Sequence, residues 1–185
     1  MPSDLGHALL GLLARRPSTG YELSRRMERP VGWFWSAGHS QVYPELVRLE
    51  AAGLVRHEEV PGRGPRPTKR YHVTPSGTEA LRAWVTAELA PQPVRDLEVL
   101  RLWSLWLVDA RAAADLVARV RDGHAERLAV YEEQLASLDG DQAALDPASP
   151  LFASRLTLEG GRRTRVAALE WCDWMLAELA AARPR

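Results

Sequence analysis

A proline- and glycine-rich segment between two short strand-like runs constrains the fold more than any other feature of the sequence. The segment PGRGPRPT, residues 61–68, holds too many of these two residues to form regular structure. The flanking runs, Val55 to Val60 and Arg70 to Thr74, have the length and residue types of strands. We therefore expect a single β-hairpin, with helical patterns on either side of it.

Two helices are expected at the start of the chain. Apolar residues recur with helical spacing over about residues 3–15, which predicts an amphipathic helix; they are Leu5, Leu9, Leu12 and Leu13. Pro17 ends this helix. Ser18 or Thr19 then caps a second helix of about residues 19–28.

Proline and glycine positions delimit the next two helices. Proline is best tolerated in a first helical turn, so Pro44 predicts that a third helix begins near Ser40 or Gln41. Gly53 should end it. After the hairpin, Thr74 caps a fourth helix that opens with proline. Three helices, a two-stranded hairpin and one further helix are the layout of a winged helix-turn-helix domain.

The stretch APQPVRD, residues 90–96, indicates a domain boundary because it is rich in proline. Beyond it we expect three helical segments, of about residues 96–108, 110–138 and 151–182. The fold class is thus mainly α with a small β-hairpin wing. A winged helix-turn-helix domain would occupy residues 1–90 and a helical domain residues 91–185.

The charge distribution gives a mild indication of an electrostatic footprint. Basic and acidic residues balance at 24 each over the whole chain. Residues 1–90 hold 12 basic and 9 acidic residues, whereas residues 91–185 hold 12 and 15. The first part is therefore the basic one, and it is the part that suits an acidic partner.

Several classes of protein are not expected. The longest apolar stretch, Leu97 to Val108, contains two charged residues and is too short to cross a bilayer, and the start does not read as a signal peptide. The single cysteine, Cys172, cannot form an intramolecular disulfide, and no metal-ligand spacing or catalytic motif is present. We expect a cytoplasmic protein that is not an enzyme and needs no cofactor or metal.

Three segments, in this order along the chain, resemble those of a known family: LGHALLGLLARRPSTGYEL, HSQVYPELVRLEAAGLV and KRYHVTPSG. Together they resemble the PadR-like transcriptional regulators, and most of all the longer subtype with a helical C-terminal region. The resemblance covers about residues 5–90 in detail and the rest only in length and helical character. It implies a homodimer that binds palindromic operator DNA, usually as a repressor relieved by a small ligand.

At 100° per residue the third helix has two distinct faces. Val42, Leu46 and Leu49 form the apolar face. The opposite face and its flank carry the candidate DNA-binding residues, which are Ser40, Gln41, Tyr43, Pro44, Val47 and Arg48. Glutamine can pair with adenine, arginine with guanine, and valine can meet a thymine methyl group. The alternative is that these residues are only the solvent side of a surface helix.

The hairpin is the strongest local concentration of positive charge. Between Pro61 and Gly77 no acidic residue occurs, and the basic residues are Arg63, Arg66, Lys69 and Arg70. Such a hairpin can follow a phosphate strand or enter a minor groove. A solvated loop is the alternative. Tyr21, near the start of the second helix, is either a core residue or a phosphate contact.

Apolar residues in the second half of the chain point to assembly. Residues at near-heptad spacing form a seam between Ala113 and Leu138. One chain offers little obvious cover for so many apolar helices, so we expect residues 91–185 to dimerise with a second copy. The alternative is a helical subdomain that closes on itself.

Tryptophans are concentrated in the same region. A candidate pocket for a small aromatic effector would use Trp103, Trp106, Trp171, Trp174 and His124. The alternative is that the tryptophans supply packing area to the dimer and the core. Taken together, the sequence predicts a homodimeric DNA-binding regulator. There are two alternatives. One is a winged-helix module that binds another protein, and the other is a small-molecule-binding protein built on the tryptophan-rich helices.

Overall fold

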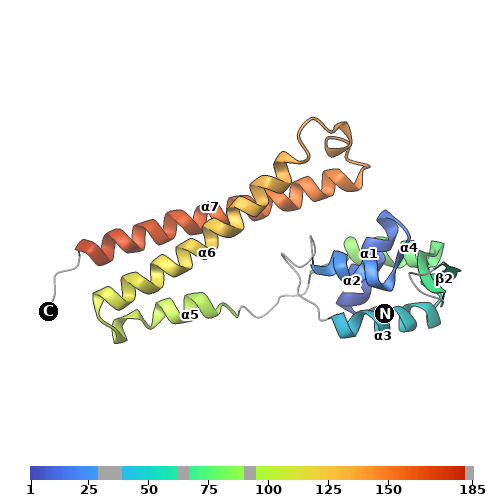
Figure 1. Cartoon of the computed structure of the whole chain (residues 1–185), viewed down its shortest axis with the longest axis horizontal. Coiled ribbons are helices and arrows are strands. Elements are labelled where there is room, and N and C mark those ends of the chain that lie inside the picture. Colours follow the sequence, from blue (N-terminus) through green and yellow to red (C-terminus); the bar gives the residue numbers. More distant parts are fainter. Residues whose placement is uncertain (29–38, 62–66, 90–94, 182–185) are drawn as a thin grey trace. The chain divides into compact units, whose positions relative to one another are not determined.

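The computed structural model describes residues 1–28, 39–61, 67–89 and 95–181. The chain divides into two compact units, Met1–Pro91 (unit 1) and Gln92–Arg185 (unit 2). Helices dominate both units, and a small antiparallel sheet belongs to unit 1 (Figure 1). The mainly helical fold class expected from the sequence is confirmed.

The described helices of unit 1 are α1 (Asp4–Arg15), α2 (Gly20–Glu28), α3 (His39–Ala51) and α4 (Pro75–Val85). Two of them begin at side-chain caps. Ser3 Oγ accepts a hydrogen bond from the Gly6 N–H at 3.0 Å in α1, and Thr74 Oγ1 accepts one from the Gly77 N–H at 3.0 Å in α4. The core of unit 1 consists of Leu9, Leu10, Leu12, Leu13, Leu23, Met27, Val42, Leu46, Leu49, Val55 and Tyr71.

The start of α3 differs slightly from the prediction. The helix begins at His39 rather than at Ser40 or Gln41, so Pro44 lies in the second turn and not in the first. Because proline has no N–H, the Ser40 carbonyl receives no hydrogen bond from the residue four positions on. The helix therefore lacks one backbone hydrogen bond at this position.

Gly53 ends α3 as predicted. The Leu54 N–H donates to the Leu49 carbonyl and the Gly53 N–H to the Glu50 carbonyl, both at 2.9 Å. Gly53 has φ +70°. These two hydrogen bonds and the left-handed glycine make a Schellman motif, which turns the chain directly into the wing.

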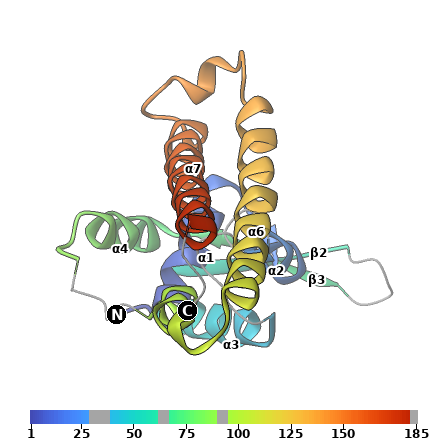
Figure 2. The same ribbon diagram turned by 90° about the vertical axis from the view of Figure 1, so that its left-hand side faces the viewer.

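The sheet has one strand more than the sequence indicated. β1 (Ser18–Thr19), β2 (Val55–Val60) and β3 (Thr68–Val73) are antiparallel and lie in the order β1-β3-β2. Figure 2 shows β2 and β3 as a ribbon that extends past the helices of unit 1. β1 is too short to give an alternating pattern, so a two-stranded hairpin was the most that the sequence could predict.

Unit 2 is built on two long helices that lie side by side, α6 (Ala110–Ala136) and α7 (Pro150–Ala181) (Figure 1, Figure 2). A short 3-10 helix, η3 (Gln142–Ala144), lies in their connection. The α6 seam is covered by α7 of the same chain: Val117 packs with Cys172, and the Tyr131 ring lies against Gly161. Part of the cover that the sequence did not reveal is thus supplied within the chain.

The segment predicted as one helix over residues 96–108 is broken. It forms α5 (Leu97–Trp103) and, after Ser104, the 3-10 helix η2 (Leu105–Leu107). Leu102 of α5 joins the core of unit 2, but most of the other apolar side chains of this segment are exposed; they are Leu97, Val99, Leu100, Trp103, Trp106, Leu107 and Val108. We call this set the α5–η2 apolar face.

Over the ranges described above, no helix is long and apolar enough to span a membrane. Within those ranges, no group of three or more His, Cys, Asp or Glu side chains is placed to hold a metal ion. Cys172 is fully buried, and burial raises the pKa of its thiol. The thiol therefore stays protonated at neutral pH and acts as a small apolar group.

Candidate nucleic-acid interface

One face of α3 is buried and the opposite face is exposed. Val42, Leu46 and Leu49 are at most 2% exposed and belong to the core. All the α3 residues predicted to bind DNA are exposed: Ser40, Gln41, Tyr43, Pro44, Val47 and Arg48. Val47 is 62% exposed and Tyr43 54%. The helix therefore presents apolar as well as polar groups, which is the mixture that base edges require.

Tyr21 lies on the surface and not in the core. It is the second residue of α2, and its side chain is 53% exposed. The core alternative for this residue is thereby excluded. Because Tyr21 belongs to the first turn of α2, a hydrogen bond from its hydroxyl to a DNA phosphate is chemically suitable.

The wing carries Lys69 and Arg70 in exposed positions on β3. The other two basic residues predicted to contact DNA, Arg63 and Arg66, lie outside the described residues. The partner strand is acidic, because Glu59 lies opposite Lys69 and Glu58 opposite Arg70. Arg70 Nη1 is 4.0 Å from Glu58 Oε1. The positive charge of β3 is therefore partly offset close to the hairpin loop. The sequence reasoning did not foresee this, because it considered acidic residues only between Pro61 and Gly77.

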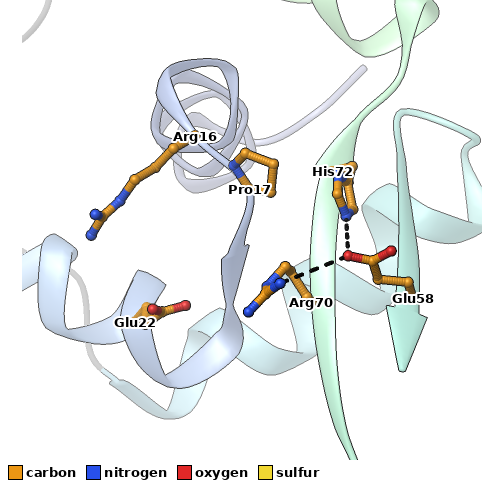
Figure 3. A pocket seen from close by; sticks show the side chains of 6 residues that line it. All are labelled: Arg16, Pro17, Glu22, Glu58, Arg70 and His72. Atoms are coloured by element: carbon orange, nitrogen blue, oxygen red, sulfur yellow. Dashed lines mark hydrogen bonds and ion pairs between the residues drawn. The ribbon is translucent and has the colours of Figure 1, made fainter. Parts of the chain in front are cut away.

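An open pocket of about 290 Å³ lies where β1 meets β3, lined by Arg16, Pro17, Glu22, Glu58, Arg70 and His72 (Figure 3). Glu58 Oε1 lies 3.0 Å from His72 Nε2 and faces Arg70. Hydrogen bonding from Thr19, whose N–H is 2.7 Å from Glu22 Oε2, lowers the pKa of Glu22, so this carboxylate is charged. The pocket is therefore lined by charges of both signs.

In unit 2 the candidate effector residues differ in exposure. Trp103 and Trp106 are each 78% exposed and Trp174 is 59% exposed. Trp171 instead packs against the core beside Cys172. Within a single chain, three of the four rings thus lie open on the surface, as expected for side chains that a further surface covers.

His124, the remaining candidate effector residue, is 6% exposed and links three helices. Arg165 Nη1 of α7 is 2.9 Å from His124 Nδ1, and His124 Nε2 is 2.9 Å from Glu98 Oε1 of α5. A guanidinium can only donate and a carboxylate can only accept. His124 Nδ1 therefore accepts from Arg165 and the Nε2–H donates to Glu98, so α5, α6 and α7 are joined by one polar chain.

Comparison with known proteins identifies both units. The model of the transcriptional regulator PadR-like family matches residues 9–83, and that of the virulence activator alpha C-terminal family matches residues 94–180. The probable transcriptional regulator Rv1176c of Mycobacterium tuberculosis is 32% identical over 180 residues, which are 91% of this chain and 94% of the relative. The chain belongs to the PadR-like family of transcriptional regulators.

Solved structures are similar to this PadR-like chain over nearly all its length. The negative transcriptional regulator PadR of Bacillus subtilis is 28% identical over 177 residues, covering 94% of this chain and 96% of the relative. Its complex with operator DNA gives a TM-score of 0.85 at 26% identity, covering 96% of this chain and 99% of that chain. Its complex with p-coumaric acid gives a TM-score of 0.79 at 27% identity, covering 95% of this chain and 98% of that chain.

A third relative is the virulence activator AphA of Vibrio cholerae. Its structure gives a TM-score of 0.71 at 30% identity, covering 96% of this chain and 99% of that chain. With the order of helices and strands in unit 1, these similarities confirm the predicted winged helix-turn-helix fold.

Sequence reasoning missed two residues that contact candidate site residues of this PadR-like chain. Glu45 contacts Arg48, and Arg165 contacts His124. Glu45 is only 3% exposed and accepts a hydrogen bond from Arg48 Nη1 at 2.7 Å. A signal for it existed, because at 100° per residue a position three after Val42 lies near the apolar face, where a charge is unusual. Arg165 had no comparable signal, since its contact with His124 spans 41 residues.

Proposed function

We propose that this chain is a homodimeric repressor that binds palindromic operator DNA and is relieved by a small aromatic ligand. The observation that carries the proposal is the exposed face of α3, which holds Gln41, Val47 and Arg48 opposite three buried core residues. The similarity to PadR, which has been solved with operator DNA, supports it. A non-enzymatic regulator of this kind acts on the chromosome, so we place it in the cytoplasm.

In this proposal α3 lies in the major groove and its exposed side chains contact base edges. Gln41 pairs with adenine, Arg48 with guanine, and Val47 meets a thymine methyl group. Lys69 and Arg70 of the wing, together with Arg63 and Arg66, contact phosphates and set the register. Ser40, Tyr43, Pro44 and Tyr21 complete the surface.

The α5–η2 apolar face is the proposed contact between the two copies. Trp103 and Trp106, each 78% exposed, are the largest exposed side chains in that face. Exposed apolar patches of this kind mark interfaces, and a two-fold axis through unit 2 suits the two half-sites of a palindrome. In this assignment residues 1–90 bind DNA and residues 91–185 dimerise.

The ligand would act through unit 2. A small aromatic compound fits a site at Trp103, Trp106, Trp171, Trp174 and His124 once a second copy closes over the exposed rings. The structure of PadR with p-coumaric acid supports a phenolic carboxylic acid as the class of compound. Binding would shift the helices of unit 2 and change the separation of the two copies of α3.

Selection of bound sequences from a random DNA pool tests this function. We expect a palindromic consensus, and labelled DNA of that sequence then gives affinities by fluorescence anisotropy. Gln41→Ala should weaken binding by about tenfold and relax one position of the consensus, whereas Lys69→Ala should weaken binding to all sequences and lower the salt slope by about one. Arg119→Ala, which removes an exposed cation from α6, is the control.

The dimer is tested by light scattering after size-exclusion chromatography. Trp103→Ser combined with Trp106→Ser should convert a dimer into a monomer without loss of helical circular dichroism, because both rings are exposed in the single chain. A wild-type monomer at micromolar concentration, or a pool without selected sequences at low salt, would reject the proposed function.

A further inference from the structure

A buried carboxylate lies on the helix that is proposed to read DNA. Glu45 of α3 is 3% exposed, and both of its oxygens have partners. Ser3 Oγ donates to Glu45 Oε1 at 2.7 Å, and Arg48 Nη1 donates to Glu45 Oε2 at 2.7 Å. One carboxylate thus connects the N-terminal cap of α1 to the exposed face of α3.

The space for this carboxylate depends on a glycine. A Cβ atom at Gly6 would lie 2.6 Å from Glu45 Oε1. Because Gly6 has none, the carboxylate reaches the first turn of α1, where Ser3 Oγ also accepts the Gly6 N–H. The first turn of a helix carries partial positive charge, which further stabilises an anion at this place.

Glu45 is ionised at neutral pH despite its burial. Burial alone would raise the pKa of Glu45, but the hydrogen bonds from Ser3 and Arg48 outweigh it and leave the pKa below its ordinary value. The Arg48 side chain is 72% exposed. Its guanidinium is therefore fixed at one nitrogen by a buried anion, while most of the side chain faces solvent.

We propose that Glu45 is a specificity-determining residue that positions Arg48 for base recognition. The inference rests on the proposed function, in which α3 lies in the major groove. A fixed guanidinium loses less rotamer freedom when it pairs with a guanine than a freely rotating one does. Pairing with the correct base therefore contributes more to the binding free energy. The buried anion also offsets the charge of Arg48, which lowers its attraction to phosphates of any sequence.

These two effects predict opposite changes when the charge of Glu45 is removed. Glu45→Gln should bind non-specific DNA more tightly at low salt, with a salt slope steeper by about one, because Arg48 is no longer neutralised. It should also lose about tenfold in discrimination between the consensus and an operator changed at the base pair that Arg48 reads. A merely structural residue would weaken binding to both DNAs together.

Ser3→Ala is the matched control. It removes the other hydrogen bond of Glu45 and leaves the contact with Arg48 in place, so thermal stability should fall while discrimination stays within twofold of the wild type. Arg48→Ala completes a double-mutant cycle. In the Arg48→Ala background, Glu45→Gln should cause no further change in discrimination. If Glu45→Gln does not fold, Glu45→Met fills the same buried space with an apolar chain and gives the same readout.

The outcomes separate this inference from the function on which it rests. A wild-type chain that binds no DNA at low salt rejects the function itself. Wild-type binding with discrimination unchanged in Glu45→Gln, or reduced equally by Ser3→Ala, rejects only the role of Glu45. A loss of discrimination that persists in the Arg48→Ala background also rejects it, because Glu45 would then act without Arg48.

Discussion

The Tyr43 ring of α3 lies directly against Gly20, the first residue of α2. A Cβ atom at position 20 would be 2.5 Å from Tyr43 Cε1 and 3.0 Å from Cζ. The backbone of α2 thus holds a ring that is still 54% exposed on the proposed DNA-binding face. The absence of a side chain at Gly20 determines where the ring stands.

Gly20→Ala should displace the Tyr43 ring and weaken operator binding by several-fold with little loss of thermal stability. The ring is at the end of a side chain that can rotate toward solvent, so the clash is relieved by moving Tyr43. Circular dichroism melting and anisotropy titration measure the two effects. In a Tyr43→Ala background the substitution should no longer affect binding, and an effect that remained there would contradict this explanation.

Gly11→Ala is the control for backbone entropy. Gly11 lies inside α1, and a Cβ at this position would have no neighbour within 4 Å. Alanine there should raise the free energy of unfolding by up to about 1 kcal/mol, because it lowers the entropy of the unfolded chain and favours the helix.

Gly77→Ala should destabilise unit 1 strongly. A Cβ at Gly77 would overlap the backbone carbonyl oxygen of Leu54, which cannot rotate away, and would also lie 2.9 Å from Val73 Cγ2. The expected loss is about 3 kcal/mol in the free energy of unfolding, at the upper end of overpacking effects. Urea unfolding followed by circular dichroism measures it, and a loss below 1 kcal/mol would show that α4 can move away from the wing.

His124→Leu should destabilise unit 2 by about 1–3 kcal/mol, since it leaves buried polar groups of Arg165 without partners. Arg165 Nε is already buried with no hydrogen-bond partner among the described residues. Glu98→Gln keeps an acceptor for the His124 Nε2–H and should cost less. Chemical unfolding of the three proteins gives the order, and equal losses for both variants would show that the chain of hydrogen bonds is not the cause.

Glu159 on α7 should make stability depend on pH in acid. Hydrogen bonds from Arg162 and then Arg163 lower the pKa of Glu159 from 4.5 to about 2. A lowered pKa means that the contribution is complete above pH 4.5 and is lost as the pH falls from 4.5 to 2. Glu159→Gln should flatten the curve of thermal midpoint against pH in that window, and a curve that keeps its wild-type slope there would contradict this explanation.

Local patterns predicted the helices and the faces of α3 because they depend on residues close in sequence. Val42 and Leu46 have helical spacing and are buried, and Thr74 caps α4 as proposed. The base and phosphate contacts themselves stay predictions. The surface that these contacts would need is present, because Gln41 and Arg48 are exposed.

The features that sequence reasoning missed depend on distant partners or on very short elements. Glu45 and Ser3 are 42 residues apart, so no local spacing indicates that their side chains meet. The break after α5 falls at Ser104, where neither proline nor glycine marks an interruption. The tryptophans were recognised as a group, but spacing along a helix could not show that Trp171 is covered while Trp103 is exposed.

The two-residue strand β1 has a mechanical consequence for regulation. Ser18 and Thr19 lie between α1 and α2 and pair with Tyr71 and Arg70 of β3, so the wing is fastened to the turn that leads into α2. We therefore expect the strands of the wing and the helices of unit 1 to tilt together. In the proposed dimer, an effector would release the operator by changing the angle between the two DNA-binding units, and not by bending a wing away from its groove.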